Sequence, residues 1–509
     1  MNSEERKAFL ILAVMLLATA WTSYGYFELD EHFQIIEFAG SKLGIVPIQN
    51  LPWEYKAEIR PWLQPTLFIG ICKLLRFGGI EDRFVWTFIF RLCCAICGFF
   101  SMLGIYRLGI AWFPDKQIQR RHLWLCATLG FLPFLFVRTS SESLSASCFA
   151  IGVSVLLRYF NHSNPVEPAI PYPIWLFSGL MLGLAFEFRY QIIIMIGGLG
   201  LWLLLSVKAK WKSISIASIG FLIAFGIGFL ADRYGYGKWT FPFYRYFRIN
   251  LLERKTADFG TDPFFAYLYL PLANFFAPIL LVLLIFLFVF WARKPGHVLF
   301  WITLPFFLFH CFIGHKEERF LIPLIPLTIP ILHLAFLKDG QIALPRFFQI
   351  PFWRQSYKWL WRYNWLWLLL FCIYPFNVEP YIKHQRFIYE HQRNTNTYYA
   401  VNFDPYHRNE LIYSFYRSND LKVVEVGTLA EMASIVEKNA AKEIYFFWTM
   451  PYLENWPNGL VPRTSLINPS HFFFRWRWLL KISTPILKSL HSRFEEVQCP
   501  SLFRISPQK

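Results

Sequence analysis

The chain has 509 residues, of which 55% are hydrophobic, 20% aromatic and 16% charged. Soluble globular domains carry about 25% charged residues, so this composition excludes an ordinary soluble protein. The formal net charge of +17 could suit a nucleic-acid-binding protein, but the Lys and Arg residues occur in small groups between apolar runs. Such grouping is typical of the segments that flank membrane spans. The composition therefore predicts an integral membrane protein that binds no nucleic acid.

Apolar runs long enough to cross a bilayer, which takes about 20 helical residues, recur along the chain. They predict about eleven spans, of which the fifth is short and could be a broken or re-entrant helix. The first contains Ala18-Thr19-Ala20, which resembles a signal-peptidase site, but its apolar stretch continues to Phe27 and predicts an uncleaved anchor. The expected spans are 8–27, 84–106, 122–137, 143–159, 174–187, 190–207, 213–231, 264–291, 297–313, 320–337 and 363–378.

The charges between these spans predict the orientation. With a cytoplasmic N-terminus, the inner loops contain the basic groups at 116–121, 208–212, 293–294 and 338–362. This is the positive-inside pattern. Most acidic residues before residue 379 then fall on the outer side. Because acidic residues contribute little to topology, chemistry on the outer face is one explanation for their gathering there.

The chain changes character after the last expected span, which predicts a membrane domain over residues 1–378 and a second domain over residues 379–509. The second domain contains no spanning segment. Thr428 and Glu431 form a capping-box pattern at the start of a helix. A strand–helix–strand unit of this kind predicts a small α/β domain, on the outer side if there are eleven spans. Its predicted elements are a strand at 422–426, a helix at 430–439 and a strand at 443–448.

The first outer loop, residues 28–83, begins with two adjacent acids, Asp30 and Glu31, directly after the first span. A carboxylate at the lipid boundary is partly desolvated, which makes it more basic and suits a general base acting on a hydroxyl. Apolar residues at helical spacing over 35–43 predict an amphipathic helix in the membrane interface. The alternative is that both acids are solvated charges at a helix start.

A second charged cluster, His315-Lys316-Glu317-Glu318-Arg319, forms a short hairpin between two apolar spans. Lys and Arg at such a place can hold a phosphate by charge-assisted hydrogen bonds, and these cations are expected to face outward. A solvated turn is the alternative.

Ionisable residues also occur at the outer ends of other expected spans, namely Arg138 with Glu142, and Glu187 with Arg189. Residues of this kind at membrane depth often mark functional sites, although structural Arg–Glu pairs explain them equally well. The following outer loop, which contains Tyr236, is rich in glycine and aromatic residues. It suits a bent loop against a sugar or lipid, or simply a turn.

Taken together, these segments resemble glycosyltransferase family 22. The block from His315 to Phe320 is the most specific part, and the resemblance covers roughly residues 8–337. Leu29 departs from the family pattern, which has proline before the two acids, and the short loops suggest a prokaryotic relative. The matching residues are Asp30-Glu31-His32 with Gln34 and Glu37, Trp53-Glu54-Tyr55, Ile59-Arg60-Pro61, Arg138-Thr139 with Glu142, Tyr236-Gly237 with Trp239, and His315-Lys316-Glu317-Glu318-Arg319-Phe320.

The resemblance implies a multi-pass GT-C fold and an inverting α-mannosyltransferase. Its donor would be polyprenyl- or dolichyl-phosphate-mannose, and its acceptor a hydroxyl of a lipid-linked or other glycan. The reaction would occur on the non-cytoplasmic face of a bacterial inner membrane or of the endoplasmic reticulum, among membrane lipids.

The resemblance also implies roles for individual residues. Asp30 would be the general base, and Glu31 would support it or bind the acceptor. Cations on a fixed hairpin would stabilise the charge that develops on the lipid phosphate, so neither a cofactor nor a metal is expected. The expected donor-phosphate ligands are His315, Lys316, Arg319 and Arg138. The expected substrate-binding residues are Glu54, Arg60, Glu142, Arg189, Glu317, Glu318 and Tyr236.

Three other functions stay open. Transporters place binding groups near the bilayer midplane and often contain repeats, whereas here the ionisable groups gather at one interface and no repeat is visible. A metal-dependent hydrolase could use Asp30, His32, His315 and Glu317, but no helical pair of histidines supports it. A flippase of a lipid-linked or anionic substrate is the third.

Overall fold

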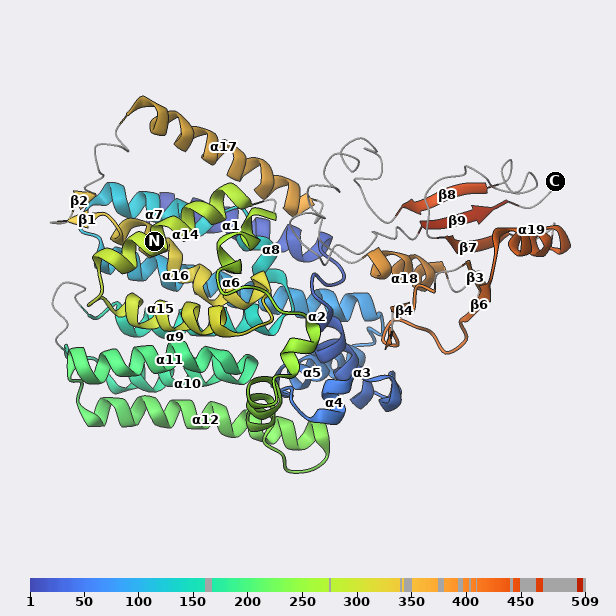
Figure 1. Cartoon of the computed structure of the whole chain (residues 1–509), viewed down its shortest axis with the longest axis horizontal. Helices are drawn as coiled ribbons and strands as arrows, with labels where there is room; N and C mark the ends of the chain where they lie inside the picture. Colours follow the sequence, from blue (N-terminus) through green and yellow to red (C-terminus); the bar gives the residue numbers. More distant parts are fainter. Residues whose placement is uncertain are drawn as a thin grey trace. The chain divides into compact units, whose positions relative to one another are not determined.

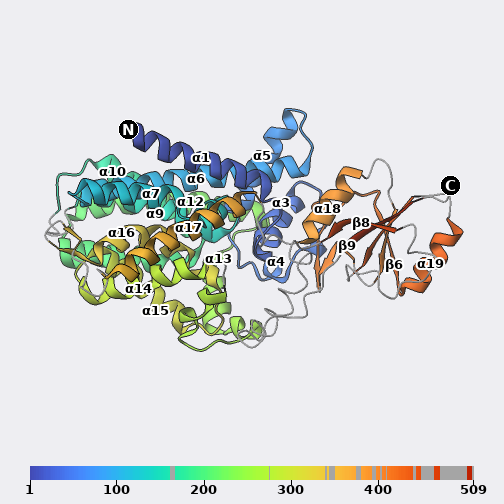
Figure 2. The same cartoon turned by 90° about the horizontal axis from the view of Figure 1, so that it is seen from above.

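The computed structural model describes residues 1–160, 167–273, 276–338, 341–342, 350–373, 380–391, 397–401, 404–408, 410–439, 443–448, 464–469 and 501–506. The chain divides into two compact units, coloured by sequence in Figures 1 and 2. The helical unit comprises Met1–Ser23, Trp53–Leu74 and Phe88–Pro375. The sheet unit comprises Tyr24–Pro52, Leu75–Thr87 and Phe376–Lys509, and so includes parts of the predicted first outer loop.

Helices make up most of the chain before residue 374. In chain order they are α1 (Ser3–Thr22), α2 (Leu29–Glu31), α3 (Glu37–Lys42), α4 (Trp53–Ala57), α5 (Leu63–Phe77), α6 (Arg83–Trp112), α7 (Lys116–Thr128), α8 (Leu132–Val137), α9 (Ser141–Leu157), α10 (Tyr172–Phe188), α11 (Ile193–Trp202), α12 (Trp211–Tyr236), α13 (Pro242–Phe247), α14 (Ala277–Arg293), α15 (Val298–Phe312), α16 (Ile325–Leu334) and α17 (Pro351–Ile373). A two-stranded ladder of β1 (Leu337–Lys338) and β2 (Gln341–Ile342) precedes α17.

Small residues let the helices of the helical unit approach closely. Figures 1 and 2 show α10 beside α9 and α12, which it contacts extensively. A Cβ on Gly179 would lie 1.8 Å from the carbonyl oxygen of Ala217, and one on Gly220 would lie 2.1 Å from that of Leu176. Gly179 and Gly183 are spaced as in the small-xxx-small pattern of packed membrane helices. Substituting these glycines would therefore force α10 and α12 apart.

Three segments among the described residues are long and apolar enough to cross a membrane: Arg83–Trp112, Tyr190–Val207 and Trp211–Tyr236. The helices α14 and α15 together would make a fourth, bent by 120°. The fifth expected span is one continuous helix, α10, and is not broken. The total of eleven spans stays a prediction.

Prolines explain why three expected spans begin or divide differently from the sequence prediction. The segment 122–137 divides into α7 and α8, with Pro133 in the first turn of α8. The segment 264–291 becomes α-helical only at Ala277, after 3₁₀ turns that include Pro271. The segment 320–337 starts as a 3₁₀ helix containing Pro323. Proline lacks the N–H that an α-helix needs in its interior.

The C-terminal part of the sheet unit is a small α/β domain. Its described strands form a five-stranded sheet in the order β6-β3-β7-β9-β8, in which β3 is parallel to both β6 and β7. The helices are α18 (Pro380–His391) and α19 (Leu429–Lys438), and β4 (His407–Arg408) pairs with β5 (Leu411–Ile412). The strands of the sheet are β3 (Thr397–Val401), β6 (Lys422–Val426), β7 (Ile444–Trp448), β8 (Thr464–Pro469) and β9 (Ser501–Ile505).

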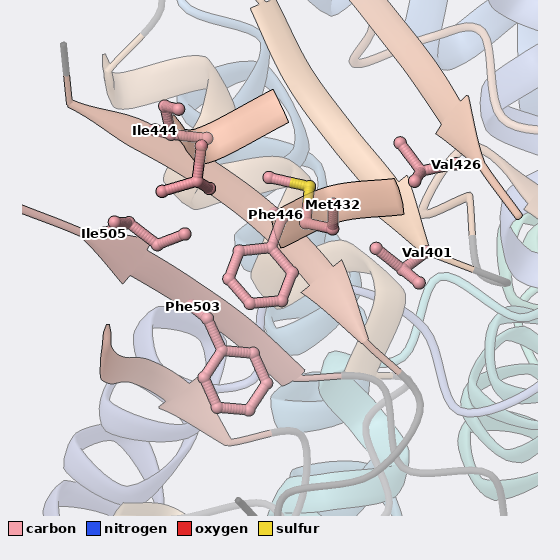
Figure 3. Close-up of a cluster of buried hydrophobic side chains, with 8 residues drawn as sticks. Val401, Val426, Met432, Ile444, Phe446, Phe503 and Ile505 are labelled. Carbon is pink, nitrogen blue, oxygen red and sulfur yellow. The ribbon is translucent and has the colours of Figure 1, made fainter. Parts of the chain in front are cut away.

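The predicted strand–helix–strand unit is present as β6, α19 and β7. Thr428 caps α19 by accepting from the N–H of Glu431, and Glu431 in turn accepts from the N–H of Gly427. Figure 3 shows side chains from the sheet and from α19, Met432 among them, meeting in one buried cluster. The strand β3 separates β6 from β7 and was not predicted from the sequence.

The segment that follows Asp30 differs from the expected interfacial helix. It consists of a π-helical turn, His32–Ile36, and the short helix α3. Ile35, Ile36 and Phe38 are buried within the protein, so the predicted amphipathic helix at a membrane surface is wrong. Helical spacing alone cannot distinguish burial against lipid from burial against another part of the chain.

Candidate functional site

The carboxylate loop, residues 27–37 of the sheet unit, carries the predicted base. Asp30 is the middle residue of α2 and is partly buried. Glu31 is 1% exposed, and its Oε1 accepts from the main-chain N–H of Phe27 at 3.1 Å and of Glu28 at 3.3 Å. Glu31 therefore folds the loop back on itself next to Asp30, and its expected role toward the base or the acceptor stays a prediction.

Glu37 forms a second anchor in the same loop. Its Oε1 lies 2.8 Å from Nε2 of His32 and accepts from the N–H groups of Ser414 at 2.8 Å and Phe415 at 3.0 Å. The ring of His32 stacks on Tyr416 with centroids 5.8 Å apart. Among the described residues, no three His, Cys, Asp or Glu side chains are grouped to hold a metal ion.

Glu37 binds a C-terminal segment, residues 413–417, called the strap here. Arg83 binds the same strap through other main-chain groups. Arg83 donates from one guanidinium nitrogen to the carbonyl oxygens of Phe415 at 2.6 Å and Arg417 at 3.0 Å. Tyr416 stacks on Phe84 with ring centroids 4.2 Å apart. The strap therefore fixes the carboxylate loop through main-chain groups. Sequence reasoning missed this, because the two segments are 377 residues apart in the chain.

The basic hairpin, residues 315–319 of the helical unit, is closed by internal hydrogen bonds. His315 Nε2 lies 2.7 Å from Glu317 Oε1, and Arg319 Nε donates to Glu317 Oε2. Burial alone raises the pKa of the Glu317 carboxyl, but the charge of Arg319 and the hydrogen bonds from His315 and Arg319 outweigh it and hold that pKa well below its usual range. Glu318, at the start of the following 3₁₀ helix, is partly buried.

Lys316 does not face outward as expected. Its side chain is 2% exposed, and Nζ donates to the carbonyl oxygens of Ile313 at 2.7 Å and Asp262 at 3.1 Å. Burial lowers the pKa of this ammonium, while the charge of Asp262 opposes the shift. Two of the three N–H donors of Lys316 thus bind main-chain carbonyls. The bond to Asp262 fixes the hairpin to the loop that precedes α14. The expectation of outward-facing cations is wrong for Lys316, because the ammonium satisfies carbonyls that no helix pairs.

Glu142 connects the basic hairpin to other helices. It is 1% exposed, and its Oε1 lies 3.1 Å from Arg189 and 3.9 Å from Arg319. Both guanidinium groups also lie against the ring of Phe320, at 5.5 and 5.6 Å. The structure therefore brings together side chains from α9, the end of α10 and the hairpin, which the sequence could only present as separate candidates.

Arg138, the fourth expected phosphate ligand, has different neighbours. Its guanidinium donates to the carbonyl oxygen of Ser23 at 2.6 Å and to the hydroxyl of the same serine. It also lies 5.1 Å from the ring of Phe134. Arg138 therefore contacts the end of α1 in the structure, and its role toward a phosphate stays a prediction.

The segment from Trp53 to Trp62 forms a second group in the helical unit. Glu54 lies 3.6 Å from Arg60, whose carbonyl oxygen accepts from the hydroxyl of Tyr236 at 2.8 Å. The structure adds Glu58, which sequence reasoning missed: its carboxylate contacts Lys238 at 2.5 Å and Arg245 at 3.4 Å. The sequence did contain a signal for Glu58, because this acid lies between Glu54 and Arg60, which were both predicted to bind substrate.

These features define an integral membrane protein with buried ion clusters at the ends of its helices. The chain belongs to the Alg9-like mannosyltransferase family, which matches residues 7–403. This membership confirms the family predicted from the motifs.

Several named mannosyltransferases are similar to this chain. "Mannosyltransferase APTG1" of Arabidopsis thaliana is 27% identical over 65% of this chain and 58% of its own length. A "probable Dol-P-Man:Man(7)GlcNAc(2)-PP-Dol alpha-1,6-mannosyltransferase" of Schizosaccharomyces pombe is 35% identical over 64% of this chain and 57% of its own. The chain thus spans less than two thirds of the length of these relatives. Both are eukaryotic, and the prokaryotic origin stays a prediction.

Some solved structures are also similar to this chain, at lower sequence identity than these relatives. ArnT from Cupriavidus metallidurans bound to undecaprenyl phosphate matches 98% of each chain at a TM-score of 0.47 and 12% identity. The archaeal oligosaccharyltransferase AglB from Archaeoglobus fulgidus, in complex with an inhibitory peptide and a dolichol-phosphate, matches 90% of this chain and 71% of its own at a TM-score of 0.46 and 12% identity.

Proposed function

We propose that the chain is an inverting α-mannosyltransferase that uses a polyprenyl- or dolichyl-phosphate-mannose donor and a hydroxyl of a lipid-linked or other glycan as acceptor. The family match over residues 7–403 carries this proposal, because it contains the acids of the carboxylate loop and the whole basic hairpin. The name of the Schizosaccharomyces relative, which specifies dolichol-phosphate-mannose, supports the donor class. A transporter or flippase, the alternative function, has no comparable support.

In the proposed reaction, Asp30 accepts the proton of the acceptor hydroxyl while the hydroxyl oxygen attacks the anomeric carbon of mannose. The bond between that carbon and the phosphate oxygen breaks, and the lipid phosphate leaves with the electron pair and one more negative charge. Glu31 and Glu37 keep the carboxylate loop in place through the contacts given above. His315 and Arg319 stabilise the leaving phosphate by charge-assisted hydrogen bonds, and Lys316 keeps the hairpin in place through its contacts with main-chain carbonyls.

The arginines at and beside the basic hairpin suit this task. Glu142 and Glu317 already hold Arg189 and Arg319 in position. A phosphate oxygen can take the place of a carboxylate oxygen on the same guanidinium, because the planar donor fork of arginine binds both carboxylates and phosphates bidentately. We infer that donor binding rearranges these pairs, and that Arg319 and His315 make the main phosphate contacts.

The test is transfer of radiolabelled mannose from purified polyprenyl-phosphate-mannose into extracted lipids and glycans by the purified full-length protein. A positioned general base contributes about 10²–10⁴-fold, so Asp30→Asn is expected to lose that much at saturating donor while it stays folded. Glu81→Gln, an exposed acid of the same unit, is the matched control. An Asp30→Asn variant as active as this control would contradict the assignment of the base.

The proposal also places the carboxylate loop, the basic hairpin and residues 379–509 on the non-cytoplasmic side. The positive-inside distribution supports this orientation. Labelling of single cysteines from outside intact vesicles, together with a C-terminal reporter fusion, tests it. A C-terminus on the cytoplasmic side would require an even number of spans and would overturn the orientation without affecting the chemistry.

A further inference from the structure

The helical unit contains a groove of about 640 Å³ between α7 and α17. Its volume falls in the range of about 300–1,000 Å³ that is usual for small-molecule sites. Basic and aromatic side chains dominate its lining, and the proposed reaction uses none of them. Those that matter here are Arg120, Arg121 and Trp124 of α7, and Tyr357, Trp361 and Trp365 of α17.

The two helices that form the groove are fixed to each other at one end. The side-chain amide of Asn364 on α17 donates to the carbonyl oxygen of Thr128 at 2.7 Å and accepts from the N–H of Gly130 at 2.7 Å. Asn364 is buried, and a Cβ at Gly130 would lie 2.9 Å from the main-chain carbonyl oxygen of Asn364. The amide thus satisfies main-chain groups at the end of α7 and holds α17 in register beside it. The two walls of the groove are therefore fixed relative to each other by specific hydrogen bonds.

One edge of the groove already binds an anionic oxygen. Glu4 Oε1 accepts from Arg120 Nε at 2.6 Å and from Trp124 Nε1 at 3.0 Å. This contact neutralises Arg120 only. Arg121, the next residue, is exposed, and no carboxylate of the described part of the chain forms an ion pair with it. The groove therefore carries, next to the Glu4 contact, a guanidinium whose positive charge no carboxylate of the described residues neutralises.

The remainder of the groove suits hydrocarbon. Trp361 and Trp365 lie one turn apart on α17, and that helix also exposes Trp359, Leu366 and Leu369. Tryptophan is enriched where membrane helices meet the headgroup region. The positive-inside pattern predicts that Arg120 and Arg121 lie at the cytoplasmic end of their helix, where anionic lipids attract basic residues.

We propose that this groove binds one anionic phospholipid, with its phosphate at Arg121 and its acyl chains along Trp361 and Trp365. The charge complementarity of the basic edge and the apolar continuation along α17 together select a lipid over a soluble anion. Basic pockets between membrane helices on this side bind phosphate headgroups in other proteins. The inference does not depend on the proposed catalytic function, because it uses a separate set of residues.

Native mass spectrometry of the purified, detergent-solubilised full-length chain tests the proposal. The probes are phosphatidylglycerol, phosphatidylcholine with the same acyl chains, and inorganic phosphate. We expect one phosphatidylglycerol to bind at least about tenfold more tightly than phosphatidylcholine. Arg121→Gln should reduce that binding about tenfold, whereas Arg107→Gln, which changes another exposed arginine outside the groove, should leave it unchanged.

Further variants separate the lipid from a loss of folding. Arg121→Lys keeps the positive charge and should restore part of the binding, and the melting temperatures of all variants without lipid should agree. Equal binding of the two lipids, or equal loss in the Arg121→Gln and Arg107→Gln variants, would overturn the proposal. So would displacement of phosphatidylglycerol by millimolar inorganic phosphate, because the groove would then be an anion site without lipid selectivity.

Discussion

The carboxylate loop and the basic hairpin contain similar numbers of charges but satisfy them in opposite ways. In the loop, Glu31 and Glu37 accept chiefly from main-chain N–H groups. At the hairpin, the carboxylates of Glu317 and of the neighbouring Glu142 on α9 face arginine side chains. Main-chain groups cannot swing away, whereas a guanidinium can exchange one anionic partner for another. The loop is therefore suited to hold a catalytic group still, and the hairpin to accept an incoming phosphate.

Among the variants that test this difference between the loop and the hairpin, Glu37→Ala is expected to have the largest effect on stability and transfer. It leaves two main-chain N–H groups and His32 without their acceptor, and each buried unsatisfied group costs about 1–3 kcal/mol. We expect the free energy of unfolding to fall by roughly 3 kcal/mol or more, with a drop in transfer of about a hundredfold. Thermal unfolding and the labelled-mannose assay measure both.

The matched control for Glu37 is Glu390→Ala, which removes the exposed pair with Arg386 in the same unit and should cost below about 1 kcal/mol. Glu37→Gln keeps an acceptor oxygen and should recover part of the transfer rate. If Glu37→Ala matched the Glu390 control, the strap would have no positioning role, while the assignment of Asp30 as base would stand.

The next largest effect is expected at Arg319 in the basic hairpin. Arg319→Ala removes a charge-assisted contact worth about 1.5–3 kcal/mol, so donor use should fall about tenfold to hundredfold. The loss should appear in the KM for the lipid-phosphate donor. Steady-state kinetics at varied donor concentration measure it, with Arg248→Ala, which removes an exposed pair with Glu253, for comparison. Unchanged donor kinetics would mean that the hairpin ion pairs serve only the fold.

A smaller and mixed effect is expected at Lys316. Because its ammonium holds two main-chain carbonyls, Lys316→Met should destabilise the protein by about 1–2 kcal/mol and weaken donor use by no more than about tenfold. From the sequence alone, which placed this charge outward, the loss of Lys316 was expected to weaken donor use while leaving the protein folded. Melting temperatures of Lys316→Met and Arg319→Ala, measured together, distinguish a turn-fixing lysine from a ligand-binding one. A Lys316→Met protein of normal stability would favour the ligand role.

The smallest effect concerns the acid dependence of stability. The pKa of Glu317 is lowered in the folded protein, and the unfolded value is about 4.3. Its contribution to stability is therefore fully present above that value and is lost as the pH falls toward the folded pKa. The gap in melting temperature between wild type and Glu317→Gln should narrow from pH 6 to pH 3.5. A constant gap over this interval would show that Arg319 and His315 do not stabilise the carboxylate.

Features encoded in consecutive residues could be predicted from the sequence. The apolar runs of α6 and α12 and the alternation of β6, α19 and β7 are local patterns, and each element formed close to its predicted place. The capping role of Thr428 is local as well. The charged motifs were recognisable for the same reason, since each is a short run of adjacent residues.

Partners between distant segments could not be predicted. Glu142 could have paired with Arg138, four residues away, but it contacts Arg189 and Arg319 instead. Arg138 binds Ser23 at the end of α1, and Glu58 binds Lys238 across a loop. Hydropathy and charge patterns say that such residues need partners, because buried charges are costly when unpaired. They do not say which of several available partners the packing of helices brings within reach.

The sequence by itself determined a helical membrane protein, a C-terminal α/β domain and the residues of both charged motifs, because periodicity and motif are properties of neighbouring residues. Only the tertiary structure decided that Lys316 turns inward to bind carbonyls and that the strap at 413–417 holds Glu37. Those outcomes depend on which main-chain N–H and C=O groups remain unpaired once the helices have packed. Most buried polar groups in folded proteins have a hydrogen-bond partner, and the packing of the folded chain decides which partner each of them meets.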